Sequence, residues 1–251
     1  MTNVNIRFKQ EEWIPGVIVG DNHDIVRSTY DDSTRSVWSL VRAQKNEEYN
    51  IESTTINMEF KTGVMDIDIS ELTNCQNLEQ LTLISLDLTE IDLSPLANLS
   101  HLYSLDLHWN NVETIDLEVL ASSPSLETIN LKSNKLTSLR LGQLPRLKSL
   151  NLSSNMLNEI DLTTLSSSPN LESVNLELNC LGSLDLFPLT YCVNLKSLNL
   201  DLNRLENIQL APLANCHNLE YLNLAHNPLD VIDLQPIEKL ESLKEIILPT
   251  R

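Results

Sequence analysis

The sequence predicts an α/β solenoid, in which short structural units stack one behind the other. Two observations predict this fold class. A leucine recurs every 24 residues, with one interval of 21, through most of the 251-residue chain. The residues that follow each such leucine alternate between apolar and polar, as in a strand with one buried face. A unit of this size cannot bury its own apolar face, so neighbouring units have to cover it.

The recurring leucines mark segments that share one longer pattern. They are Leu78, Leu102, Leu126, Leu147, Leu171, Leu195, Leu219 and Leu243. The pattern reads L-x-x-L-x-L-x-x-N-x-L, then x-x-I-x-L-x-x-L and a short return, as in LKSLNLDLNRLENIQLAPLANCHN from Leu195. It resembles the leucine-rich-repeat family, in a variant with a second I-D-L signature, from about Ile67 to the C-terminus. The resemblance implies a horseshoe with a parallel β-sheet on its concave side and short strand, 3₁₀ or helical turns on its convex side.

The second signature predicts short extended segments on the convex side, because Ile91-Asp92-Leu93 and its counterparts also alternate with period two. Pro95 and Pro188 follow two of these segments, and proline suits the first position of a helical turn. We therefore expect short helical or 3₁₀ turns to begin at Ser94 and Phe187. The repeat that begins at Leu126 is three residues short, which predicts a local change of curvature.

Three regions are expected along the chain. Residues 1–50 do not follow the repeat and are interpreted as an N-terminal cap, with a separate interaction module as the alternative. Within them, STRSVWSLVRA predicts a short helix. Residues 51–77 are a degenerate first repeat, and residues 78–251 are the solenoid, with seven repeats and a partial C-terminal one. No capping helix follows the final strand segment, so we expect that the native protein continues, or that a partner or second copy covers this uncapped edge.

Composition narrows the classes of function. The balance of 17 basic and 35 acidic residues gives a net charge of −18, which disfavours phosphate backbones and anionic lipid. We therefore expect a protein partner, and neither nucleic acid nor membrane. The N-terminus shows no signal peptide, which predicts a cytoplasmic protein. Cys75, Cys192 and Cys216 precede repeat leucines and should be buried, whereas an exposed Cys180 would fit a reducing compartment.

One asparagine per repeat is predicted to be structural. The row is Asn110, Asn134, Asn155, Asn179, Asn203 and Asn227. The resemblance implies that these side chains point inward and hydrogen-bond the backbone where the chain leaves each strand. A buried turn has unpaired backbone amides and carbonyls, and one amide side chain can satisfy both kinds.

The partner-binding residues are expected on the concave face. Most of that face is monotonous Asn and Ser, and variation is confined to a few positions. A first predicted cluster comprises Ile84, Tyr103, His108 and Trp109. A second comprises Leu178, Leu202, Tyr221 and His226, beside Glu177 and Asp201, and Asp106 and Lys132 complete the set. Exposed Trp and Tyr are typical anchors of interfaces. The alternative is that Trp109 packs onto a neighbouring repeat or the cap.

The convex side carries a row of aspartates, and its role is left open. The row is Asp92, Asp116, Asp161, Asp185 and Asp233, interrupted by Arg140 and Gln209. One hypothesis is a calcium site, although a single-file row supplies few of the six to eight oxygens needed. The other is a solvated row in which Arg140 bridges Asp116 and Asp161.

No catalytic or cofactor motif is present: we find no nucleophile elbow, Walker loop, paired metal histidines or dinucleotide fingerprint. No catalytic residue, metal or cofactor is therefore predicted. The sequence predicts a protein–protein interaction scaffold that binds its partner on the concave face. The alternative is a recognition domain or fragment of a larger regulatory protein or enzyme. We expect no catalysis by this chain itself.

Overall fold

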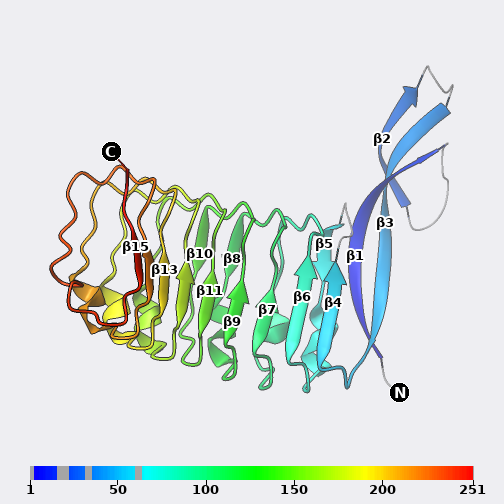
Figure 1. Cartoon of the computed structure of the whole chain (residues 1–251). Coiled ribbons are helices and arrows are strands. Elements are labelled where there is room, and N and C mark those ends of the chain that lie inside the picture. The colour runs from blue at the N-terminus through cyan, green and yellow to red at the C-terminus, as the bar shows by residue number, and fades with distance from the viewer. Residues whose placement is uncertain (1–2, 16–22, 32–35, 60–63, 251) are drawn as a thin grey trace.

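The fold, a computed structural model, is a solenoid whose front is one long sheet (Figure 1). The structure describes residues 3–15, 23–31, 36–59 and 64–250. Nine parallel strands form the sheet in the order β15-β14-β13-β12-β11-β9-β7-β6-β4. They are β4 (Thr55–Glu59), β6 (Gln80–Ile84), β7 (Ser104–Asp106), β9 (Thr128–Asn130), β11 (Ser149–Asn151), β12 (Ser173–Asn175), β13 (Ser197–Asn199), β14 (Tyr221–Asn223) and β15 (Glu245–Ile247).

Each strand pairs in register with its counterpart in the next repeat. Ser173 lies beside Ser197, Val174 beside Leu198, and Asn175 beside Asn199, and neighbouring pairs follow the same rule. A repeat position therefore becomes a row of side chains along the solenoid, with neighbours about 4.8 Å apart. The inward rows are aliphatic and fully buried, as at Leu198 and Leu200 (0% exposed each), and they merge into one core.

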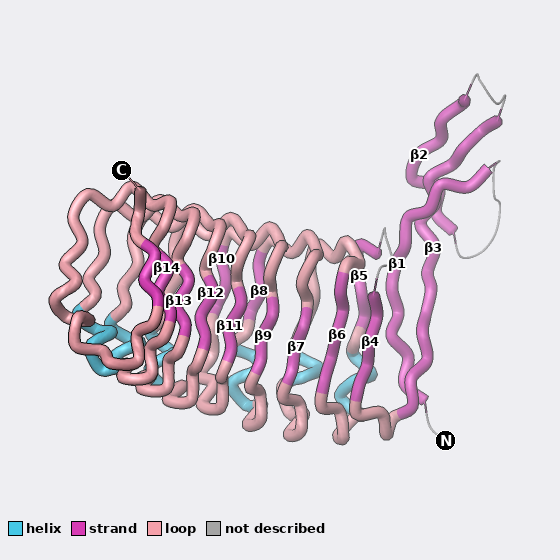
Figure 2. Tube along the Cα trace, in the orientation of Figure 1, coloured by secondary structure: helices cyan, strands magenta, loops and turns pink. Residues whose placement is uncertain are grey.

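Short 3₁₀ turns lie along the back of the solenoid (Figure 2). They are η1 (Ser70–Asn74), η2 (Ser94–Leu96), η3 (Glu118–Ser122), η4 (Thr163–Ser167), η5 (Phe187–Tyr191) and η6 (Ala211–Asn215). The turns predicted to begin at Ser94 and Phe187 are confirmed, each with proline in its first turn.

The short repeat forms differently from the others. Its back segment is β10 (Ser138–Arg140), which pairs in parallel with β8 (Thr114–Asp116) of the preceding repeat. No 3₁₀ turn separates β10 from β11, a stretch that the structure describes in full. Gly142 follows β10, and a Cβ atom there would lie 2.8 Å from the carbonyl oxygen of Leu117. Only glycine allows the two repeats to approach this closely.

The N-terminal residues form a second, antiparallel sheet of order β2-β3-β1-β5. Its strands are β1 (Asn3–Pro15), β2 (His23–Asp31), β3 (Ser36–Asn50) and β5 (Val64–Asp68). The predicted helix in STRSVWSLVRA is therefore wrong from Ser36 onward, and residues 33–35 lie outside the described ranges. Its apolar residues suit either secondary structure, and backbone pairing with both β1 and β2 decides for a strand.

The antiparallel sheet joins the solenoid through β1 and β5. Val4 and Ile6 of β1 are buried within the same core as the repeats. Arg7, next along β1, lies opposite Asp68 and pairs with it at 3.6 Å and with Glu71 at 2.6 Å. Figure 1 shows β2 and the adjoining end of β3 projecting away from the repeats. Within the described ranges, no helix has the length and apolar character needed to cross a lipid bilayer.

Candidate interaction surface

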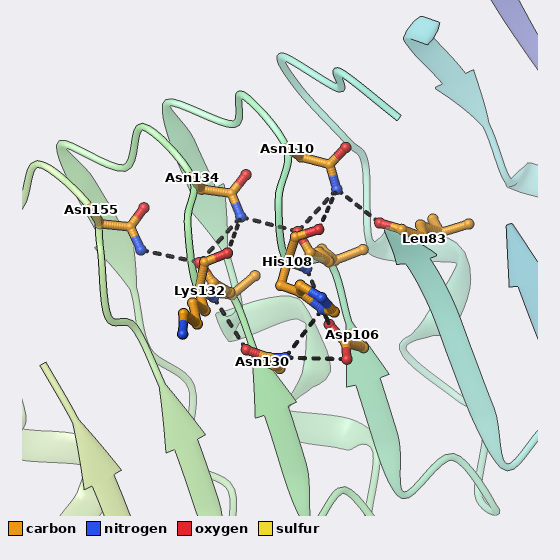
Figure 3. A network of polar contacts seen from close by, with 10 residues as sticks. Leu83, Asp106, His108, Asn110, Asn130, Lys132, Asn134 and Asn155 are labelled. Atoms are coloured by element: carbon orange, nitrogen blue, oxygen red, sulfur yellow. Dashed lines mark hydrogen bonds and ion pairs between the residues drawn. The ribbon is translucent and has the colours of Figure 1, made fainter. Parts of the chain in front are cut away.

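The central row of the sheet face consists mainly of asparagines. Their side chains hydrogen-bond the backbone just after their own strands. The side-chain oxygen of Asn130 accepts a hydrogen bond from the backbone N–H of Lys132 at 3.2 Å, and Asn151 and Asn175 do the same two residues on. The amide of Asn130 also donates to Asp106 at 3.1 Å (Figure 3). These side chains are committed to local turns, so they offer little to a ligand.

A second row of asparagines is buried behind the strand ends. The side-chain oxygen of Asn110 accepts hydrogen bonds from the backbone N–H groups of Leu86 and Leu88, at 3.0 and 3.2 Å. Its amide donates to the carbonyls of Leu83 and Leu107, at 2.8 and 2.9 Å (Figure 3). The other members repeat this bridge between adjacent repeats: Asn134, Asn155, Asn179, Asn203 and Asn227.

The residue just before each buried asparagine has a left-handed backbone. We call these residues the strand-end row: Ser85, which precedes Leu86 in the first repeat, and Trp109, Ser133, Ser154, Leu178, Leu202 and His226, with φ between 50° and 58°. For residues other than Gly, Asn and Asp, this conformation costs about 1–2 kcal/mol. Serine, at three of these positions, is small. Tryptophan and leucine gain nothing from the backbone there.

The large members of the strand-end row are also exposed to solvent. Trp109 is 52% exposed, Leu178 49% and Leu202 40%. Met156, just beyond the buried Asn155, is 50% exposed in the repeat adjacent to Leu178. Sequence reasoning missed Met156, although its counterparts in other repeats include a lysine and an arginine. Strained backbone is concentrated at functional sites in proteins, and exposed apolar patches mark interaction surfaces, so the strand-end row is the candidate interaction surface.

Two histidine–aspartate pairs lie beside these apolar residues. The Nδ1 of His108 is 2.6 Å from the carboxylate of Asp106, and its ring meets Trp109 edge to face at 5.1 Å between centroids. The Nδ1 of His226 is 2.7 Å from the carboxylate of Asp201, which neighbours Leu202. In each case the carboxylate orients the imidazole next to an exposed apolar side chain, so polar and apolar contacts are offered together.

Comparison with protein families identifies this architecture. A model described as leucine rich repeat matches residues 193–249, and one described as BspA type leucine rich repeat region matches residues 47–143. The chain is a leucine-rich-repeat protein. No curated protein sequence matches it.

Solved leucine-rich-repeat structures share the fold. Internalin C2 from Listeria monocytogenes is 27% identical with a TM-score of 0.60, and the match covers 78% of this chain and 80% of that one. TLR13, solved as a complex with ssRNA13, is 26% identical with a TM-score of 0.66, covering 78% of this chain and 28% of that one. The L. monocytogenes internalin inlF, at 23% identity and a TM-score of 0.56, covers 73% and 52% and supports the fold alone.

The structure does not bring the four residues of the first predicted cluster together in one exposed patch. Ile84 is buried, at 8% exposed, so its place in an exposed patch is wrong. It lies at the end of β6, where stacking at strand spacing leaves an aliphatic side chain little access to water. Tyr103 precedes β7, whereas Trp109 lies beyond the other end of that strand, and the Tyr103 hydroxyl contacts the amide of Gln80. The first cluster therefore reduces to His108 and Trp109.

The second predicted cluster is largely brought together. Leu178, Leu202 and His226 are consecutive members of the strand-end row. Tyr221 is half-buried and begins β14, so it lies toward the opposite end of the strands. Glu177 precedes Leu178 and accepts a hydrogen bond from the Asn199 side chain at 3.1 Å. Lys132, elsewhere on the face, is exposed.

A row of alternating charges at the strand starts was not anticipated. Lys148 pairs with Glu127 at 2.7 Å, Lys196 with Glu172 at 2.7 Å, and Lys244 with Glu220 at 2.6 Å. The hydrogen bond from Lys244 lowers the pKa of Glu220. The sequence could have predicted these ion pairs, because the residues occupy one repeat position and alternate in the sign of their charge. Such exposed pairs favour the observed register but stabilise little.

The aspartates of the row on the back each close a local turn, which leads into a 3₁₀ turn for four of the five. Each carboxylate accepts a hydrogen bond from the backbone N–H two residues later, at 2.8–3.0 Å, in Asp92, Asp116, Asp161, Asp185 and Asp233. The hydrogen bonds from Thr163 lower the pKa of Asp161. The predicted bridge from Arg140 to Asp161 is wrong: Arg140 pairs with Asp116 at 3.4 Å and with Glu118. No group of three or more metal-ligating His, Cys, Asp or Glu occurs among the described residues.

The cysteines divide by exposure. Cys75, Cys192 and Cys216 are buried, whereas Cys180 is partly exposed. The thiols of Cys192 and Cys216 contact the carbonyls of Leu165 and Leu189, at 3.4 and 3.5 Å. Burial raises the pKa of Cys192 to about 12, with a contribution from nearby Cys216, and that of Cys216 to about 11.

We expect iodoacetamide at neutral pH to label Cys180 in the native protein and to leave Cys192 and Cys216 unlabelled until the chain is unfolded. The thiolate is the reactive form, and raised pKa values deplete it at the buried sites. Mass spectrometry of labelled peptides, before and after urea, measures this. Equal labelling of Cys180 and Cys192 in the native protein would contradict the burial of Cys192.

Proposed function

We propose that this chain is a protein-interaction scaffold whose partner binds the sheet face at the strand-end row. The observation that carries the proposal is that Trp109, Leu178 and Leu202 are large, exposed apolar side chains held at positive φ. A fold selected for stability alone would place Gly or Asn there. Leucine-rich-repeat proteins are interaction modules in general, which supports the same conclusion.

The charge around the strand-end row favours a basic or mixed-charge partner. Glu177 and Asp201 flank the two leucines, and the whole chain carries −18. Apolar anchors with charged neighbours are the usual composition of an interface centre and its rim. Charge complementarity would mainly speed association and select the partner.

The proposal is tested by replacing Trp109, Leu178 and Leu202 together with serine, the residue that three other repeats carry at this position. A partner that the wild-type chain captures from its native lysate should be lost by the triple variant. Phe187→Ser is the matched control, because Phe187 is 59% exposed but lies on η5 at the back. Retention of every partner by a folded triple variant would refute binding at the strand-end row.

Two other functions are a recognition domain of a larger protein and the binding of nucleic acid. A recognition domain within a larger regulatory protein or enzyme would use the same surface. Nucleic acid is addressed by one comparison, since the TLR13 structure is a complex with ssRNA13. We propose that this chain does not bind nucleic acid, because its charge of −18 repels phosphate. We also propose that the chain catalyses no reaction itself.

We further propose that the protein is cytoplasmic and that it can self-associate. A cytoplasmic location is supported by the described cysteines, all of which are free thiols. Self-association through β15, which hydrogen-bonds β14 within the sheet, would use the outer strand edge. Light scattering at high concentration distinguishes a dimer from a monomer.

A further inference from the structure

A groove of about 530 Å³ lies on the back of the solenoid, away from the sheet face. It is lined by Ile67, Glu90, Ile91, Asp92, Thr114, Ile115, Asp116, Ser138, Leu139 and Arg140. These residues come from β5, from the segment 90–92, from β8 and from β10, which follow one another along the chain. Figure 1 places β5, β8 and β10 behind the front sheet. The volume is within the usual range of ligand-binding pockets.

The floor of the groove is a row of aliphatic side chains. Ile67, Ile91, Ile115 and Leu139 occupy the same position in four successive units, and Ile115 lies beside Leu139 in the β8–β10 pair. Ile91 and Leu139 are half-buried, so they keep apolar surface open to an occupant. Four units at strand spacing span about 14 Å, which an extended segment of four or five residues would cover.

The rim of the groove is negatively charged. Glu90, Asp92 and Asp116 are acidic, and Arg140 is the single basic residue among the lining residues. Arg140 is already paired with Asp116 and with Glu118 outside the lining. The charges of Glu90 and Asp92 therefore have no basic counterpart within the groove. An occupant that is both cationic and aliphatic matches the rim and the floor together.

We infer that this groove is a second binding site, which takes a short extended peptide segment of a partner with Lys or Arg next to aliphatic side chains. A peptide is favoured over a compact ligand because the floor extends through four units. The site is separate from the strand-end row, so the scaffold engages a partner at two surfaces or engages two partners.

The repeats themselves supply a matched control. The sequence Glu90-Ile91-Asp92-Leu93 recurs as Glu159-Ile160-Asp161-Leu162, which does not line the groove. Likewise Leu184 is the half-buried counterpart of Leu139 outside the groove. Any effect of acidity or apolar character alone would therefore be the same at both members of each pair.

The experiment measures fluorescence anisotropy of a labelled short peptide of alternating lysine and leucine, added to the full chain. We expect this peptide to bind about tenfold more tightly than lysine–serine or glutamate–leucine peptides. Glu90→Lys and Leu139→Ser should each weaken binding about tenfold, whereas Glu159→Lys and Leu184→Ser should not. Glu90 is exposed, so its variant remains decisive if Leu139→Ser fails to fold.

Three results would overturn the inference. They are no binding of the lysine–leucine peptide, equal loss in the two members of a matched pair, and a dimer by light scattering that Glu90→Lys dissociates. The last result would assign the groove to a second copy of the chain. The triple serine variant of the strand-end row should bind the peptide normally, which separates failure of this site from failure of the proposed function.

Discussion

Replacing Asn179 by alanine is expected to lower the free energy of unfolding by about 3 kcal/mol. The Asn179 oxygen accepts the backbone N–H of Leu157 at 3.0 Å, and its amide donates to the carbonyls of Leu152 and Leu176 at 3.0 and 3.1 Å. Alanine leaves the buried Leu157 N–H without a partner, at roughly 1–3 kcal/mol if water cannot reach it. The two carbonyls each lose one of two hydrogen bonds and keep those from Asn155 and Asn203, and each lost bond costs about 0.5–1.5 kcal/mol. Urea unfolding followed by circular dichroism measures the change.

The matched control is Asn175→Ala, four residues earlier in the same repeat. Asn175 is half-buried on the sheet face and accepts one hydrogen bond, from Glu177 N–H at 3.0 Å. Water can replace it, so the expected loss is below about 1 kcal/mol. Similar losses in both variants would show that the buried row does not hold adjacent repeats together.

Much of the fold was predictable because the repeat converts sequence spacing into position in space. Residues 24 apart, such as Ser173 and Ser197, become neighbours in a parallel sheet, so rows could be written from the sequence. The same logic failed for Tyr103 and Trp109, which lie in one repeat but at opposite ends of its strand. A row identifies neighbouring repeats, whereas a patch also requires the same end of the strand.

Other errors came from interactions that the repeat does not encode. Residues 36–50 lie outside the repeat, and pairing with β1 and β2 made them a strand. The aspartate turns could have been predicted, because a carboxylate two residues before a helical turn is a local motif. The left-handed backbone of the strand-end row could not, since Trp109 and Leu178 are poor indicators of positive φ. The turn before each buried asparagine imposes it.

Leu178 has a side chain that is unfavourable at its positive φ, and its replacement has the second large expected effect, on partner binding. Leu178→Asn is expected to leave the free energy of unfolding unchanged or raise it by up to about 1 kcal/mol. Asparagine tolerates positive φ, and this relief offsets the apolar contacts of a side chain that is already 49% exposed. The same substitution should weaken partner binding about 30-fold, the loss typical of an interface anchor. Urea unfolding and titration of the captured partner measure the two quantities on one variant.

Two further variants separate the causes. Leu176→Asn, two residues earlier and fully buried, should cost at least about 3 kcal/mol, because it places an unpaired amide in the core. Ser154→Asn, in the strand-end row of the adjacent repeat, should raise stability without affecting binding, since it relieves φ and removes no apolar anchor. If Leu178→Asn instead destabilised the fold by more than about 2 kcal/mol, Leu178 would be retained for packing. The proposal that the strand-end row is the binding surface would then be wrong.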